Sequence, residues 1–175
     1  MTILHENAAE LSLATADLTG FLRDVLQKGA DFRFRASGCS MSPFIKDGDV
    51  ITISPSRSTD LHVGDIAAFT EAPDDRLIVH RIIGIPGRLF IIKGDNARSQ
   101  DSSIPASRIL GCVTRIERGG RNVRLGLGPE RRLVALLSRL HLLPLMFLPA
   151  RILLKFRIRR HPATEMPAVP TEGIQ

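Results

Sequence analysis

The sequence of 175 residues contains neither tryptophan nor tyrosine, and it has only two cysteines. Proteins that bind single-stranded nucleic acid commonly stack bases on aromatic rings, so their absence disfavours that class and we expect no nucleic-acid partner. Cys39 and Cys112 are too few for a disulfide framework or a metal cluster, and nothing in the sequence indicates a cofactor. Sequence repeats and heptads are also lacking, which excludes solenoids and coiled coils.

Long hydrophobic runs are missing as well. The N-terminus has no basic region followed by an apolar run, so we expect no secretory signal peptide. In the leucine-rich C-terminal region, the uncharged stretch extends only over residues 140–150. A helix that spans a bilayer needs about 20 apolar residues. The sequence therefore predicts no spanning helix there.

Basic residues outnumber acidic ones in only one segment. Residues 1–117 carry 13 Lys and Arg against 15 Asp and Glu, a balance of −2. Residues 118–161 carry 11 Lys and Arg against Glu130 alone, a balance of +10, and residues 162–175 contribute −2. The net charge of +6 is thus local, and it suggests that this segment contacts acidic lipid headgroups or phosphates.

Hydrophobic periodicity divides the chain into a helical, a β-rich and a second helical region. Apolar residues at helical spacing predict a helix over residues 15–29, with Thr15 as its N-cap. Short β-type runs separated by Gly-Asp and Pro-Gly turns then predict a curled, mainly antiparallel β-domain. The expected strands are Phe32–Ala36, Val50–Ile53, Ile66–Phe69, Leu77–Ile85, Leu89–Ile92, Ile109–Ile116 and Asn122–Leu125.

Residues 129–160 have helical spacing again, with Pro129 suited to a first turn. The leucines expected to share one face are Leu133, Leu136, Leu137, Leu140 and Leu143. We expect a basic amphipathic element that lies in a membrane interface, so that the protein is associated with a membrane. The predicted organisation is a helical segment (1–30), a β-domain (31–126), basic amphipathic helices (127–161) and a disordered tail (162–175).

Three polar segments contain the residue types of an activated serine nucleophile. Ser40 lies in a Ser-Gly-Cys-Ser-Met-Ser-Pro segment, His80 interrupts an apolar strand, and Asp95 follows Lys-Gly, with Asp101 six residues later. Each residue alone has a structural explanation, such as capping a turn or forming a hydrogen bond inside a strand. Together they supply a hydroxyl, an imidazole and carboxylates.

These segments resemble the successive motif boxes of type I signal peptidases, in the S24/S26 superfamily of serine peptidases. The resemblance covers roughly residues 34–116 and is closest to the Ser-His branch of the endoplasmic reticulum and archaea. The five matching stretches are Gly38–Pro43 with Gly48-Asp49, Val63–Phe69, Val79–Ile83, Lys93–Asn96 and Ile109–Val113. The family implies a β-rich fold, an extended substrate groove and cleavage of a signal or leader peptide, a polypeptide partner.

The resemblance also implies a role for each matching residue. Ser40 matches the nucleophile, His80 the general base, Asp101 the acidic third member, and Asp95 a supporting carboxylate. The helix predicted over 15–29 stands where signal peptidases usually have a membrane anchor. Two alternatives stay open: a self-cleaving regulator of the LexA type, and a non-catalytic membrane-binding module with a peptidase fold. Self-cleaving repressors have Lys at the position of His80 and usually an Ala-Gly or Cys-Gly cleavage site, and no such dipeptide precedes Ser40.

Overall fold

A computed structural model describes residues 18–97 and 103–143 of the chain. Contacts divide the chain into two units, Met1–Pro144 and Leu145–Gln175, and every described residue belongs to the first. Thr15, the residues beyond 143 and the tail expected over 162–175 lie outside the described residues.

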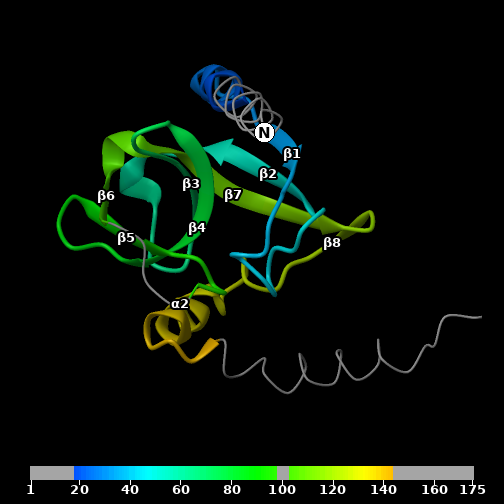
Figure 1. Ribbon diagram of the computed structural model, residues 1–175, viewed down its shortest axis with the longest axis vertical. Helices are drawn as coiled ribbons and strands as arrows, with labels where there is room; N and C mark the ends of the chain where they lie inside the picture. The colour runs from blue at the N-terminus through cyan, green and yellow to red at the C-terminus, as the bar shows by residue number, and fades with distance from the viewer. Residues whose placement is uncertain (1–17, 98–102, 144–175) are drawn as a thin grey trace, which may run out of the picture. The chain divides into compact units, whose positions relative to one another are not determined.

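One curled antiparallel sheet forms the body of this unit (Figure 1). The strands are joined in the order β1-β2-β7-β3-β4-β5-β6, and β8 pairs with β7. Every pairing between these neighbours is antiparallel. The strands are β1 (Phe32–Arg35), β2 (Val50–Pro55), β3 (Ile66–Glu71), β4 (Arg76–Gly84), β5 (Leu89–Lys93), β6 (Ser103–Pro105), β7 (Ile109–Arg118) and β8 (Arg121–Asn122).

The predicted fold class is confirmed, with two differences among the strands. β6 is a strand of three residues that pairs with β5, and its sequence, Ser-Ile-Pro, is too short to show an alternation. The strand predicted over Asn122–Leu125 is wrong, because β8 contains only Arg121 and Asn122. The chain turns away after β8, and Leu125 lies in a turn with 59% of its surface exposed.

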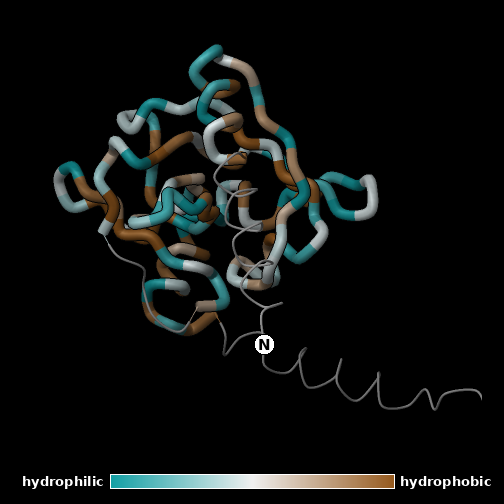
Figure 2. The backbone as a smooth tube through the Cα atoms, turned by 45° about the horizontal axis from the view of Figure 1, so that its top comes forward, coloured by the Kyte–Doolittle hydropathy of each residue, from teal (hydrophilic) through white to brown (hydrophobic). Residues whose placement is uncertain are grey.

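Two apolar cores lie on opposite faces of β3. Ile66 and Ala68 point into one core, which also contains Leu22 and Leu26 of the N-terminal helix. Ala67 and Phe69 point into the other. Both faces of β3 are therefore buried, which explains why Ile-Ala-Ala-Phe is uninterrupted by polar residues. Figure 2 shows hydrophobic stretches along the strands and hydrophilic ones in the turns that project from them.

The described residues contain two α-helices. The first covers residues 18–27, within the predicted range. The second, α2, extends from Arg131 to Arg139. The prediction of helix within residues 129–160 is confirmed for this segment, and the helix begins two residues after Pro129. Its end is a Schellman turn: His141 has a φ of 60°, and the Leu142 N–H donates to the Leu137 carbonyl at 2.9 Å.

The prediction that five leucines of this region share one face is wrong in part. α2 buries Val134, Ala135 and Ser138 against the sheet. Of the five leucines expected to share one face, Leu143 is buried, Leu137 is partly buried, and the other three are exposed. No helix among the described residues is long and apolar enough to cross a membrane.

Candidate active site

Ser40 and His80 meet at the rim of the sheet. Ser40 lies in the turn that leads from β1 toward β2, and His80 lies on β4, where it pairs with Ala67 of β3. The His80 Nε2 atom is 3.0 Å from the Ser40 Oγ atom. With Nε2 unprotonated, the serine hydroxyl donates to it, which is the geometry needed for a base to remove the proton of a nucleophile.

Asn96 forms hydrogen bonds with the backbone carbonyl groups of Cys39 and Ser40. Its backbone N–H donates to the Ser40 carbonyl at 2.8 Å, and its side-chain Nδ2 donates to the Cys39 carbonyl at 3.1 Å. Two successive carbonyls are therefore fixed by one residue. The turn is also held on its other side, where the Gly38 N–H donates to the Asp47 carboxylate at 2.9 Å.

Gly94 allows this close approach. A Cβ atom at position 94 would lie 2.9 Å from the Ser40 carbonyl oxygen and 3.1 Å from His80 Nε2. Both distances are shorter than an ordinary van der Waals contact, so any side chain there would push the two residues aside. The Lys-Gly-Asp-Asn segment thus leaves space for Ser40 and His80 at Gly94. Its Asn96 acts as a clamp, because it forms hydrogen bonds with two successive carbonyls. Gly94 and Asn96 both lie in the matching stretch Lys93–Asn96, but neither was predicted to have a role in the site.

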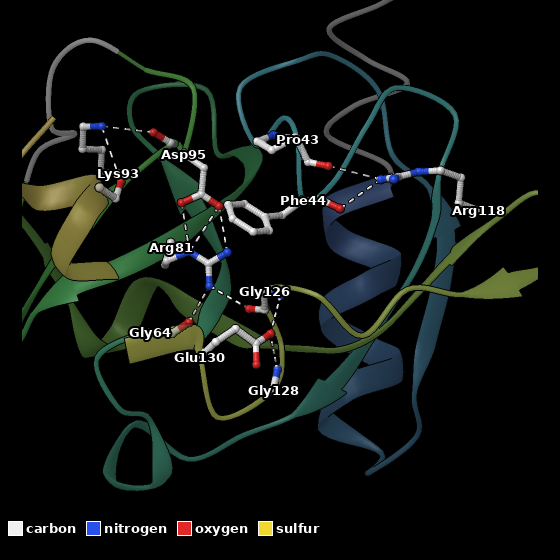
Figure 3. A network of polar contacts seen from close by, with 12 residues as sticks. Pro43, Phe44, Gly64, Arg81, Lys93, Asp95, Arg118, Gly126, Gly128 and Glu130 are labelled. Atoms are coloured by element: carbon white, nitrogen blue, oxygen red, sulfur yellow. Dashed lines mark hydrogen bonds and ion pairs between the residues drawn. The ribbon is translucent and has the colours of Figure 1, made fainter. Parts of the chain in front are cut away.

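Asp95 forms an ion pair with Arg81 (Figure 3). Arg81 Nε donates to Asp95 Oδ1 at 2.9 Å, and Nη2 donates to Oδ2 at 2.8 Å. Both side chains are completely buried. Because neighbouring residues of a strand point to opposite faces, Arg81 lies on the other side of β4 from His80. The carboxylate of Asp95 is thus half of a buried ion pair.

The Arg81 guanidinium also joins loops that are distant in the sequence. Its Nη1 donates to the Gly64 carbonyl at 2.7 Å and to the Gly126 carbonyl at 2.9 Å. The guanidinium carbon lies 5.2 Å from the centre of the Phe44 ring, a cation–π contact with the segment that follows Ser40. Arg81 was not among the predicted site residues, although a charged residue between Val79 and Ile82 is itself a signal of a buried partner.

A second ion pair fixes the far end of the segment that carries Ser40. Arg118 of β7 binds both carboxylate oxygens of Asp49, at 2.9 and 2.7 Å. It also donates to the Phe44 carbonyl at 3.0 Å (Figure 3). Burial raises the pKa of Asp49, but the hydrogen bonds from Arg118 and from the Lys46 N–H together lower it by more. The net pKa of Asp49 is therefore below its ordinary value. Asp49 is therefore ionised at neutral pH.

The third predicted member of the site, Asp101, lies outside the described residues. Its segment joins β5 to β6, between Ala97 and Ser103. The role that the family resemblance gives to Asp101 stays a prediction.

The two cysteines do not form a disulfide. Cys39 is exposed beside Ser40, whereas Cys112 lies on β7, where burial raises the pKa of its thiol to about 12. Cys112 is thus a protonated thiol at neutral pH and unsuited to nucleophilic attack. Among the described residues, no group of three or more His, Cys, Asp or Glu side chains is placed to hold a metal ion.

A groove of about 470 Å³ extends from Ser40 and His80 along β4 to Arg76. Its apolar lining comes from the N-terminal helix, β1, β2, β4 and the turn that carries Ser40: Leu18, Phe34, Met41, Ile45, Ile51, Leu77 and Val79. Beside this groove, residues 76–79 pair with β3 on one edge, and β5 pairs with β4 only from Arg81 onward. Within the described residues, this stretch therefore presents one edge without a strand partner.

Comparison with known proteins agrees with this fold. A search of curated protein sequences found no match to the chain. Residues 6–114, more than half of the chain, match the family described as Peptidase S24-like. This family of serine peptidases includes self-cleaving repressors of the LexA type. The matched range contains Ser40, His80 and the Lys-Gly-Asp-Asn segment, and it ends within β7. The chain therefore belongs to the Peptidase S24-like family.

Proposed function

We propose that the protein is a serine endopeptidase in which Ser40 is the nucleophile and His80 the general base. The observation that carries this proposal is the 3.0 Å contact between Ser40 Oγ and His80 Nε2. In the proposed reaction, His80 takes the hydroxyl proton as Ser40 attacks the scissile carbonyl, and it later delivers that proton to the leaving amine. The Ser40 N–H donates to no oxygen of the described residues, and it would bind the oxyanion.

The substrate that we propose is a signal or leader peptide in extended conformation. The edge of residues 76–79, which has no strand partner among the described residues, offers backbone hydrogen bonds to an added strand. The apolar groove beside it would accept alternate side chains of that strand. Cleavage after small side chains is what the resemblance to signal peptidases implies. Asp101 is proposed, on the same ground, as the carboxylate that orients the imidazole.

The test is mass spectrometry of candidate leader peptides incubated with the wild type and with Ser40→Ala. We expect this substitution to lower turnover on the order of 10³-fold or more. Cys39→Ala is the matched control, because the neighbouring thiol is also exposed, and it should keep its activity. Turnover that persists in Ser40→Ala and disappears in Cys39→Ala would refute the serine mechanism.

The pH dependence of turnover tests the base separately. A histidine must be neutral to accept a proton, so turnover should fall when the pH is lowered far enough to protonate the imidazole. Turnover that stays constant as the pH is lowered, measured when chemistry limits the rate, would exclude His80 as the base.

Self-cleavage is the second candidate function, because the family includes self-cleaving repressors. It is tested with the protein alone: the mass of the wild type would decrease with time while that of Ser40→Ala stays constant. A rate independent of protein concentration would identify cleavage within one chain. A wild type of constant mass that cuts added peptides supports the endopeptidase.

A further inference from the structure

The outward side of α2 is apolar. Leu133, Leu136 and Leu140 expose 58%, 52% and 55% of their surfaces. They are three and four residues apart, so they lie on one face of the helix. Leu142, in the turn that follows, is exposed as well. We call these four exposed leucines the leucine face.

The rest of α2 is fixed to the β-domain, so the leucine face points outward by construction. Val134, Ala135 and Ser138 are buried beneath the helix. Arg131 forms an ion pair with Asp65 at 3.2 Å, and Ser138 lies 3.5 Å from the buried Lys93 Nζ atom. Turning the leucines inward would break these contacts.

Two exposed arginines lie on the same helix as the leucine face. Arg132 and Arg139 are exposed, and neither forms an ion pair with the described residues. Glu130 is the single acidic residue between 118 and 161, and its carboxylate accepts hydrogen bonds from the Gly126 and Gly128 N–H groups (Figure 3). Asp65, which also contacts α2, is paired with Arg131.

We propose that the leucine face binds a membrane surface containing anionic lipid. The leucines would enter the boundary between headgroups and acyl chains, and Arg132 and Arg139 would contact lipid phosphates. A second copy of the chain fits less well, because a symmetric contact through this face would bring the arginines of both copies together. Nucleic acid would satisfy the arginines and leave the leucines in water. This inference goes beyond the proposed peptidase activity and does not depend on it.

Flotation of the full chain with vesicles tests the proposal. We expect binding to vesicles of phosphatidylcholine mixed with phosphatidylglycerol. Leu133→Gln combined with Leu136→Gln removes apolar surface without removing helix propensity, and it should weaken binding on the order of tenfold or more. Leu89→Gln is the matched control: Leu89 is also an exposed leucine, at the start of β5, and its replacement should change nothing.

The charge contribution is tested on the same vesicles. Arg132→Gln and Arg139→Gln should each lower the binding constant about fivefold, and neither should affect the weak binding to phosphatidylcholine alone. Replacing both arginines by lysine keeps the charge and should keep most of the binding. High salt should weaken binding without abolishing it, because screening removes only the electrostatic part.

Three results would overturn the proposal. The first is equal flotation of the leucine variant and the wild type. The second is loss of flotation in Phe21→Gln, which would place the attachment on the N-terminal helix, where Phe21 is 61% exposed. The third is a wild type that is dimeric without lipid and becomes monomeric in the leucine variant. Peptide cleavage in solution is measured in parallel, so failure of either proposal is distinguishable from failure of the other.

Discussion

The buried pair of Arg81 and Asp95 yields the sharpest prediction about stability. Asp95→Asn keeps the size of the side chain but removes its charge and one of its two acceptor oxygens. The amide NH₂ would then face an N–H of the Arg81 guanidinium, donor against donor. Because Arg81 is 0% exposed, water cannot compensate for either loss.

The magnitude follows from this burial. Removing one partner of a buried pair costs about 3–5 kcal/mol, because it leaves an uncompensated charge in the interior. In a domain of this size such a loss lowers the Tm by roughly 10–20 °C. Replacing both partners, Arg81→Met with Asp95→Leu, would not restore full stability. The Gly64 and Gly126 carbonyls would lose the donor that they share, at a cost of about 1–3 kcal/mol for each unsatisfied group.

The assay is urea unfolding followed by far-ultraviolet circular dichroism, since the chain has no Trp or Tyr to report by fluorescence. Asp74→Asn is the control: Asp74 lies exposed in the turn between β3 and β4, and its replacement should change the free energy of unfolding by less than about 0.5 kcal/mol. If Asp95→Asn is no more destabilising than Asp74→Asn, the ion pair does not hold these loops together and the reasoning fails.

Three further predictions concern the loops around Ser40. Asn96→Ala should lower kcat about tenfold with little change in KM, because it releases the Cys39 carbonyl while the backbone bond to Ser40 remains; an unchanged kcat would contradict the clamp. Gly94→Ala should lower kcat on the order of 10²-fold while the protein stays folded, because the added methyl displaces Ser40 and His80; activity equal to the wild type would disprove the close approach. The Asp49 carboxylate, whose pKa is lowered in the folded state, contributes stability above its unfolded pKa that is lost as the pH falls below about 4. Acid unfolding should therefore weaken the wild type more than Asp49→Asn over that range, and equal slopes would contradict the linkage.

The strands could be predicted from the sequence because their signals are local. Six of the seven expected strands have nearly the observed limits, and Gly-Asp or Pro-Gly turns flank four of them, β2, β3, β4 and β5. β6 escaped because three residues carry no alternation, and β8 was misplaced because Val123 and Leu125 continue a β-type pattern after the pairing has ended. Pairing partners decide where such short strands end, and a partner distant in sequence leaves no local trace.

The contacts around the candidate site were predictable only in part, for the same reason. Ser40 and His80 were selected by their resemblance to known motifs, and no pattern within 40 residues of chain indicates a hydrogen bond between them. Asn96 and Gly94 act on carbonyl and ring atoms of Ser40, Cys39 and His80, which come together only when the sheet curls. The roles of Asn96 and Gly94 depend on the distances of these two residues from Cys39, Ser40 and His80 in the folded protein. The order of residues in the sequence does not give those distances.

A close backbone contact sets the orientation of α2. Leucines at helical spacing indicate one apolar face, which we expected to lie in a membrane interface. The helix begins directly against Gly64, where a Cβ atom would lie 2.8 Å from the carbonyl carbon of Arg131. So near an approach favours side chains smaller than leucine beneath the helix, where Val134, Ala135 and Ser138 are buried. The bulkier Leu133 and Leu136 are consequently directed outward, which is the arrangement that a membrane surface would require of them.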